Sequence, residues 1–301
     1  MAIFLGIDGG GSKTACVVGN EIAVLGLGTS AGSNVVRVGE AQARESLHAA
    51  IRQACQSARV TTPEITRACI GVAGAAREEV REVILRLAKE IIPGEIEVVG
   101  DMEVAMEAAF GEGPGVIVIA GTGSIAYGRN TKLRTARAGG WGHAISDEGS
   151  GHWIGRAAVA IAVRETDQQS EACLFKLIAK SWGVATHEQV VMMANRSPAP
   201  DFAALLPVVL QAAQKKNQQA GSVLVQAADE LSTLAKQVIQ ALFSEQEAVP
   251  VAMSGGVFAN SAQVRENFYN RLSVKWPNVR LAQTVIEPVQ GALQLARKQA
   301  R

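Results

Sequence analysis

Short apolar runs open the chain, and helical patterns follow them. Residues 3–8, 15–18 and 22–27 are apolar runs separated by glycine-rich and Gly-Asn turns, which predicts three neighbouring antiparallel strands. A helix is predicted from about residue 38 to 58, and the run 66–72 is typical of another strand. The beginning of the chain is therefore predicted to mix α and β structure.

The segment 79–92 carries a clear helical pattern. Its apolar residues recur at helical spacing on one face, and Pro93-Gly94 ends it. A short strand at 96–99 follows and ends at Gly100-Asp101, where another short helix begins. Asp101 is therefore predicted to lie at the end of a strand.

The second half of the chain repeats this order. The run Gly115–Ala120 is continuously apolar, as expected of a strand covered on both faces, and it stops at a glycine-rich turn. Strand patterns follow at 125–129, 133–138 and 249–253, with mostly helical sequence from 150 to 243 and a terminal helix from 289.

Strands followed by helices thus occur twice, and each half has a glycine-rich turn after a strand. This repetition predicts an α/β fold of two domains with related plans and a cleft between them. We place the domains at residues 1–114 and 115–286. The terminal helix, 287–301, is expected to pack back on the first domain, because chain ends are often neighbours.

Composition and charge exclude several classes of function. The 301 residues include 29 basic and 28 acidic side chains, and aromatic residues make up only 4%. This balance is not that of a protein that binds nucleic acid or an anionic membrane. Four cysteines without metal-ligand spacing, and an N-terminus that begins with a strand pattern, predict a cytoplasmic protein without a transmembrane helix.

The first candidate site is the sequence GIDGGGSKT at residues 6–14. Consecutive glycines allow backbone N–H groups to approach a phosphate, and Ser12 and Lys13 add donors and positive charge. Asp8 ends the strand, where a carboxylate can hold a hydrated Mg²⁺. The spacing is not that of a Walker A loop. The alternative is a hairpin turn that only needs glycine.

The sequence IAGTGS at residues 119–124 repeats this arrangement, with a small-residue turn after an apolar strand. Two such loops, one in each half, can hold a triphosphate from both sides, although a hairpin is again the alternative. Asp101 is a candidate general base that accepts the proton of an attacking hydroxyl. Its alternative role is a helix N-cap, which aspartate fills well.

Two further segments carry candidate ligand contacts. Residues 139–151, GGWGHAISDEGSG, are glycine-rich and polar yet include Trp141, and a sugar needs both carboxylates and an apolar face. The alternative is a capping loop in which Ser146 or Asp147 opens the next helix. Residues 254–260, SGGVFAN, follow a strand, and the two glycines allow the backbone to approach a flat ligand such as adenosine. A tight strand-to-helix turn is the alternative.

With these elements in their order, nearly the whole chain resembles the sugar kinases of the hexokinase–actin superfamily. The closest resemblance is to the N-acetylglucosamine kinase group within the BadF/BadG/BcrA/BcrD ATPase family. It implies two ribonuclease H-like (actin-like ATPase) domains, ATP with Mg²⁺ as cofactors, and a small sugar as substrate. Similar enzymes are commonly homodimers, and neither nucleic acid nor a membrane is implied as a partner.

The resemblance also implies roles for individual residues. Asp101 would be the catalytic base and Asp8 would hold Mg²⁺ through water. The residues that would contact ATP are Asp8, Gly10, Gly11, Ser12, Lys13, Gly121, Thr122, Gly123, Ser254, Gly255 and Gly256. Those that would contact the sugar are Asn34, Asp101, Thr122, Gly140, Trp141 and Asp147.

The implied reaction transfers the γ-phosphate of ATP to a sugar hydroxyl, most readily the one at carbon six, and the implied sugar is N-acetylglucosamine. The stretch 72–75 has only small apolar side chains where N-acetylglucosamine kinases can offer a serine, so the sequence leaves the sugar open. Glucosamine, N-acetylmuramic acid and glucose are alternatives. Another is an ATPase that acts with a protein partner.

Overall fold

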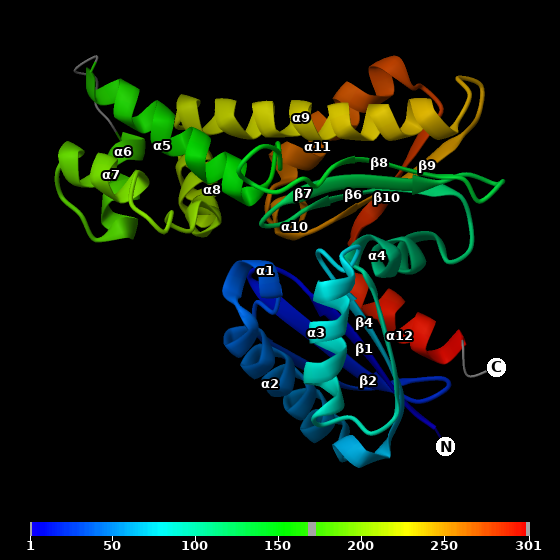
Figure 1. Cartoon of the computed structure of the whole chain (residues 1–301). Helices are drawn as coiled ribbons and strands as arrows, with labels where there is room; N and C mark the ends of the chain where they lie inside the picture. Colours follow the sequence, from blue (N-terminus) through cyan, green and yellow to red (C-terminus); the bar gives the residue numbers. More distant parts are fainter. Residues whose placement is uncertain (1, 168–172, 299–301) are drawn as a thin grey trace. The chain divides into compact units, whose positions relative to one another are not determined.

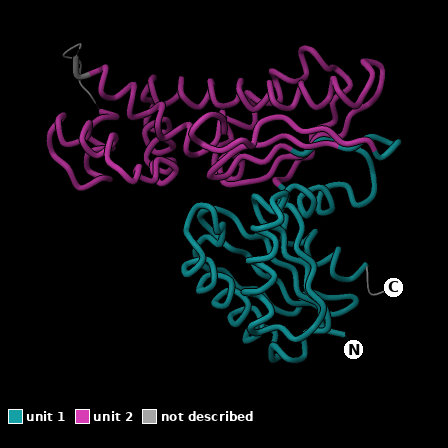
Figure 2. The backbone as a smooth tube through the Cα atoms, in the orientation of Figure 1, with its two compact units in different colours: residues 1–117, 129–133, 286–301 teal, residues 118–128, 134–285 magenta. Residues whose placement is uncertain are grey.

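Two compact units make up the chain in the computed structural model, which describes residues 2–167 and 173–298. Unit 1 comprises residues 1–117, 129–133 and 286–301, and unit 2 comprises residues 118–128 and 134–285 (Figure 2). Each unit is centred on a five-stranded sheet with helices beside it (Figure 1). The predicted α/β fold class is therefore confirmed.

The sheet of unit 1 has the strand order β3-β2-β1-β4-β5. Its antiparallel part, β1 to β3, is joined by tight turns, whereas β1, β4 and β5 run parallel. Parallel strands end at a common edge of the sheet, so the loops that follow them come together. The strands are β1 (Ile3–Gly9), β2 (Lys13–Gly19), β3 (Val24–Ala31), β4 (Ile65–Val72) and β5 (Glu95–Gly100).

Helices cover both faces of this sheet. Apolar side chains of α2 and α3 form one buried cluster with the strands, and those of α4 and α12 form another on the opposite face. The terminal helix α12 packs against α4 and β1 (Figure 1). The helices are α1 (Val35–Val38), α2 (Glu40–Ala58), the short 3-10 turn η1 (Thr62–Glu64), α3 (Glu78–Lys89), α4 (Asp101–Phe110) and α12 (Pro288–Lys298).

The second sheet has the order β10-β9-β6-β7-β8, so its first strand, β6, is central just as β1 is in the first sheet. Val116, Ile117 and Val118 of β6 are fully buried, in agreement with the predicted two-sided cover. The strands are β6 (Gly115–Ala120), β7 (Ser124–Arg129), β8 (Thr135–Gly139), β9 (Val249–Ser254) and β10 (Val279–Ile286).

Unit 2 carries most of its helices between β8 and β9. The long helix α9 packs on β8 and α5, and α11 packs on α9. Its helical elements are α5 (Gly151–Asp167), α6 (Cys173–Trp182), α7 (His187–Ala194), the 3-10 turn η2 (Phe202–Leu205), α8 (Leu206–Gln214), α9 (Gln218–Leu242), α10 (Gly256–Asn260) and α11 (Ala262–Lys275). Within residues 2–167 and 173–298, no helix combines the length and apolar character needed to span a bilayer.

Most predicted elements occur within a few residues of their observed bounds, but the sequence pattern misses β10. This strand lies at the end of the sheet order, and Val279 is its only buried residue. An edge strand whose residues are mostly half-buried or exposed shows no continuous apolar run from which a strand is predicted. The end of the predicted terminal helix, residues 299–301, lies outside the described residues.

Candidate active site

The parallel strands of unit 1 bring two acidic residues to one edge of its sheet. In the strand register, Gly9 of β1 pairs with Val72 of β4, and Val72 pairs with Gly100 of β5. Asp8 directly precedes the first position of this row, and Asp101 directly follows the last. Two carboxylates that the sequence separates by more than ninety residues therefore lie at the same end of the sheet.

Asp101 is the first residue of α4, and the helix N-cap is Gly100. The alternative assignment of Asp101 as the N-cap is therefore wrong. One of its carboxylate oxygens, Oδ1, accepts a hydrogen bond from the Met102 N–H at 3.0 Å. Glu103 reaches back so that its Oε1 accepts the Gly100 N–H at 3.0 Å, which fixes the start of the helix.

The environment of Asp8 opposes its negative charge. Burial, followed by the nearby negative charge of Asp101, raises the pKa of Asp8 to about 7, while the Lys13 ammonium acts in the opposite direction. Two carboxylates that repel each other at one sheet edge favour binding of a hard cation with oxygen ligands. The chemistry of this pair therefore fits Mg²⁺.

Backbone hydrogen bonds hold the turn after β1. Gly10 N–H donates to the Lys13 carbonyl at 3.0 Å, and the Gly10 carbonyl accepts from the N–H groups of Ser33 and Asn34 at 3.1 and 3.2 Å. The Gly10 N–H is therefore already used inside the turn. Ser12 and Lys13 are exposed beside it. Of the predicted contact residues of this loop, Lys13 lies close enough to Asp8 to lower the pKa of its carboxyl, and the binding roles of the loop stay predictions.

Asn34 is tied to the same turn through its backbone. Its side-chain Oδ1 accepts the Val36 N–H at 3.1 Å and caps the short helix α1. Thr14 is fully buried below, where its hydroxyl donates to the Ala31 carbonyl at 2.7 Å. Unit 1 therefore brings together Asp8, Asp101, the 9–13 turn and Asn34, the set that the sequence assigns to metal, phosphate and sugar contacts.

In unit 2, the loop of residues 121–124, called here the 121–124 loop, follows the central strand β6. Gly121 N–H donates to the Gly123 carbonyl at 2.9 Å, so this loop is also a tight turn. A Cβ built on Gly121 would meet no other atom within 4 Å among the described residues. Packing of the protein itself therefore does not require glycine at this position. A ligand that approaches the backbone closely would require it.

The segment of residues 139–151, called here the 139–151 loop, is bonded directly to the 121–124 loop. Asp147 is buried, and its Oδ1 accepts the Ser124 N–H at 3.2 Å. The Ser124 hydroxyl donates to the Glu148 carbonyl at 2.7 Å. A Cβ on Gly123 would lie 2.9 Å from Asp147 Oδ2, so the carboxylate packs against the backbone of the turn.

The start of α5 makes further contacts to the same turn. Gly151 N–H donates to the Gly121 carbonyl at 2.8 Å, and His152 N–H donates to the Thr122 carbonyl at 3.2 Å. Ser150 Oγ accepts the Trp153 N–H at 3.2 Å and so satisfies one of the first donors of the helix. The alternative in which Ser146 or Asp147 opens this helix is therefore wrong, because α5 begins at Gly151.

Trp141 is the exposed aromatic residue of the 139–151 loop, with 66% of its surface accessible. The Arg137 guanidinium carbon lies 4.1 Å from the centre of a Trp141 ring, and Arg137 Nη2 also donates to the Gly139 carbonyl at 3.2 Å. Gly140 has a φ of +72°, a conformation that favours glycine. An indole held in this way offers the apolar surface that a sugar ring needs.

The 254–256 segment lies against the end of β6. Ser254 is buried, and Gly255 has a φ of +96°. A Cβ on Gly255 would lie 2.4 Å from the Ala120 carbonyl oxygen, so only glycine fits between these two backbones. Unit 2 therefore brings together the 121–124 loop, the 139–151 loop and the 254–256 segment.

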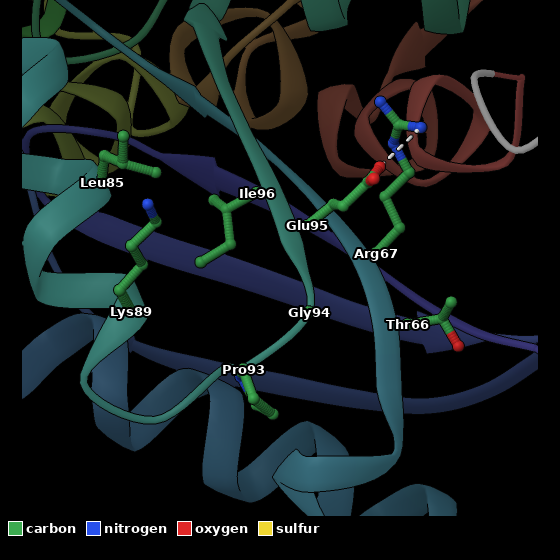
Figure 3. Close-up of a pocket in the computed structure, with 8 residues that line it drawn as sticks. All are labelled: Thr66, Arg67, Leu85, Lys89, Pro93, Gly94, Glu95 and Ile96. Atoms are coloured by element: carbon green, nitrogen blue, oxygen red, sulfur yellow. Dashed lines mark ion pairs between the residues drawn. The ribbon is translucent and has the colours of Figure 1, made fainter.

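A pocket of about 620 Å³ lies elsewhere in unit 1 (Figure 3). It is lined by α3, by the loop after it and by the first residues of β4 and β5, and it contains none of the predicted site residues. Arg67 and Glu95 form an ion pair of 3.2 Å there. Because Asp8 and Asp101 lie at the opposite ends of these parallel strands, the pocket is distinct from the candidate site.

Sequence reasoning missed the residues that hold the two loops of unit 2 together. Ser124 stands inside the quoted AGTGS motif, but nothing in the sequence shows that its hydroxyl bonds to Glu148, 24 positions later. The signal in the sequence was a serine next to the apolar positions of a predicted strand. Such a serine is often buried, and a buried hydroxyl requires a hydrogen-bond partner.

A family model and two named relatives each match nearly the whole chain. A family model described as the BadF/BadG/BcrA/BcrD ATPase family matches residues 5–296. A Clostridium acetobutylicum protein named N-acetylmuramic acid/N-acetylglucosamine kinase is 32% identical, and the match covers 99% of each chain. A Dictyostelium discoideum protein named N-acetyl-D-glucosamine kinase is 28% identical, covering 98% of this chain and 97% of that one.

Among solved structures, a protein from Chromobacterium violaceum assigned as an N-acetylglucosamine kinase superposes with a TM-score of 0.79. It is 24% identical, and the match covers 98% of this chain and 99% of the other. At this identity the likeness concerns the fold, and it extends over both units.

Proposed function

The chain belongs to the BadF/BadG/BcrA/BcrD ATPase family and has the two-domain actin-like fold, and from this premise we propose that it is an ATP-dependent amino-sugar kinase. The proposed reaction transfers the γ-phosphate of ATP to the hydroxyl at carbon six of N-acetylglucosamine. The observation that carries the proposal is the proximity of Asp8 and Asp101 at one sheet edge, beside a turn that contains Ser12 and Lys13. N-acetylmuramic acid is the second candidate acceptor, because the 32% identical relative is named for both sugars.

Asp101 acts as the general base in this proposal. It accepts the proton of the sugar hydroxyl while the hydroxyl oxygen forms a bond to the γ-phosphorus and the bond to ADP breaks. Its position at the first residue of α4 fixes the carboxylate through the helix backbone, which favours a single orientation. General base catalysis of this kind contributes roughly a hundredfold or more to the rate.

Asp8 would hold Mg²⁺ through water molecules. When bound, the cation neutralises developing charge on the phosphates. The proximity of Asp101 and the raised pKa of Asp8 support this assignment, since a cation relieves the repulsion between the two carboxylates. Lys13 and Ser12 would contribute charge and donors to the phosphates from the adjoining turn.

Unit 2 supplies contacts to both ligands in the proposal. The backbone of residues 121–123 contacts phosphate, and Ser254, Gly255 and Gly256 lie under adenosine. Trp141 and Gly140 contact one face of the sugar, and Asp147 accepts hydrogen bonds from the sugar hydroxyls. Thr122 contacts both ligands. Asn34 of unit 1 donates to a sugar hydroxyl from its place beside the 9–13 turn.

Localisation and assembly stay predictions. The free cysteines and the strand pattern at the N-terminus predict a cytoplasmic setting, and a homodimer is the state that similar enzymes commonly adopt. Neither nucleic acid nor a membrane is proposed as a partner.

The test is ADP release from Mg-ATP with a panel of N-acetylglucosamine, N-acetylmuramic acid, glucosamine, N-acetylmannosamine and glucose. One sugar should raise the rate far above the sugar-free rate, and Asp101→Asn should lower kcat roughly a hundredfold or more. Asp229→Asn is the matched control, because Asp229 is a half-buried residue of α9 that lies outside the candidate site and pairs with Arg271 at 2.6 Å. ATP hydrolysis that no sugar accelerates would instead indicate an ATPase with a protein partner.

A further inference from the structure

Ser124 uses both of its polar groups to hold a second loop. Its N–H donates to Asp147 Oδ1 at 3.2 Å, and its hydroxyl donates to the Glu148 carbonyl at 2.7 Å. Only 3% of the residue is exposed, so the hydroxyl lies inside the protein rather than at the surface that a ligand contacts. These two bonds join the 121–124 loop to the 139–151 loop within unit 2.

The two loops also meet through the backbone at the start of α5, where Gly151 and His152 donate to the carbonyls of Gly121 and Thr122. The turn that is proposed to contact phosphate therefore has bonded neighbours in the segment that is proposed to contact the sugar. A ligand that displaces or orders Glu148 on one side therefore acts on the Ser124 hydroxyl, and through it on the adjoining Gly123, on the other.

We infer that Ser124 is a positioning residue whose hydroxyl, through its bond to the Glu148 carbonyl, couples sugar binding to nucleotide binding in this chain. The inference rests on the proposed kinase function. A sugar that orders the 139–151 loop also orders the donors of the 121–124 loop through Ser124. By thermodynamic linkage, the nucleotide then raises the affinity for the sugar by the same factor. Ser124 itself touches neither ligand.

The coupling is measured as the ratio of the dissociation constants of a non-hydrolysable ATP analogue without and with saturating N-acetylglucosamine, by calorimetry in the presence of Mg²⁺. If that sugar is not the acceptor, the sugar that accelerates ADP release replaces it. For the natural protein we expect a ratio of roughly 5 to 150, the usual range of such coupling. Ser124→Ala should lower this ratio roughly fivefold, the equilibrium effect of one net hydrogen bond.

A matched control separates coupling from a general loss of stability. Ser232 in α9 is 1% exposed, and its hydroxyl donates to the Asp229 carbonyl at 2.8 Å within the helix, so Ser232→Ala deletes another buried serine hydroxyl of unit 2. Whatever change in the unfolding midpoint each alanine variant shows, only Ser124→Ala should lower the ratio. Ser124→Thr keeps the hydroxyl, so its ratio of dissociation constants should equal that of the natural protein. Ser124→Cys, with a weak donor of similar size, replaces the alanine variant should that fail to fold.

The outcomes distinguish this inference from the proposed function. Sugar-stimulated ADP release together with an unchanged ratio in Ser124→Ala or Ser124→Cys overturns the role of Ser124 and leaves the kinase intact. A ratio of one in the natural protein also overturns it. If no sugar stimulates ADP release, the proposed function fails and the inference fails with it. A fall in the ratio that Ser232→Ala does not share supports the coupling.

Discussion

Replacement of Asp8 by asparagine is expected to make the ligand-free protein more stable at neutral pH. Burial and the neighbouring Asp101 charge raise the pKa of Asp8 from 3.8 to about 7. Asparagine has nearly the same shape but no charge, so it removes the unfavourable ionisation. The variant should gain stability even as it loses the carboxylate that is proposed to hold Mg²⁺.

The direction of the pH effect follows from proton binding. Between pH 3.8 and about 7, the folded state keeps a proton on Asp8 that the unfolded state has lost. The free energy of unfolding of the natural protein therefore falls as pH rises through this window, and it levels off above the folded-state pKa. Below the window both states are protonated, and this contribution is fully restored.

The size of the effect follows from the width of the window. A shift of about three pKa units corresponds to about 4 kcal/mol at 1.36 kcal/mol per unit. Asp8 keeps some solvent contact, which reduces this value through screening. We therefore expect the free energy of unfolding of Asp8→Asn to exceed that of the natural protein by about 2–4 kcal/mol at pH 8 and to equal it near pH 4.

Urea unfolding of both proteins at intervals from pH 4 to pH 8, without Mg²⁺ or nucleotide, measures this difference. The contributions of the other titrating groups cancel in the difference, because both proteins contain the same groups. Asp229→Asn serves as the control, since it removes an exposed carboxylate whose ion pair contributes at most about 1 kcal/mol. A stability difference for Asp8→Asn that stays constant over this pH range would refute the reasoning, because it would mean that the Asp8 carboxyl titrates alike in both states.

Substitutions in unit 2 test the individual contacts. Gly121→Ala should leave the unfolding midpoint unchanged, because its methyl group meets open space, but should raise the KM for ATP in the coupled assay, because the methyl group takes the space of a close phosphate. Gly255→Ala should lower the unfolding midpoint by the equivalent of more than 1 kcal/mol, because it combines a φ of +96° with a clash against Ala120; an unchanged midpoint would contradict that packing. Trp141→Ala should raise the sugar KM about tenfold with little change in stability, as measured by kinetics and thermal unfolding. Arg137→Ala should raise the sugar KM only a few-fold, since an exposed cation–π contact contributes about 0.5–1 kcal/mol.

The fold was predictable where the local signal and the tertiary structure agree. The bounds of β6 match the apolar run Gly115–Ala120, because a strand covered on both faces shows its burial directly in the sequence. Strand β10 lacks this signal because it is an edge strand whose residues are mostly half-buried or exposed. The long helix α9 ends within one residue of position 243, where the predicted helical sequence stops, and its buried face repeats at helical spacing.

The candidate site was predictable only as separate segments. Asp8 and Asp101 each follow a recognisable strand, but their proximity depends on the order β1-β4-β5, which no local pattern specifies. The 9–13 turn is rich in glycine, yet the sequence does not show that the Gly10 N–H is already bonded to Lys13. Contacts such as Ser124 to Glu148 depend on the folded arrangement of two loops, so they become visible only in the structure.

The two glycine-rich loops occupy equivalent places, because each follows the central strand of a sheet with the same order. Their surroundings nevertheless differ. The turn after β1 lies beside two carboxylates and Lys13, whereas the 121–124 loop is fixed by bonds to Asp147, Glu148 and the start of α5. The pair of carboxylates that favours a cation thus lies in unit 1, beside its turn. The 121–124 loop of unit 2 is instead joined to the 139–151 loop by hydrogen bonds, so substitutions of Asp8 and Asp101 should act mainly on kcat and substitutions in the 121–124 loop mainly on ligand affinity.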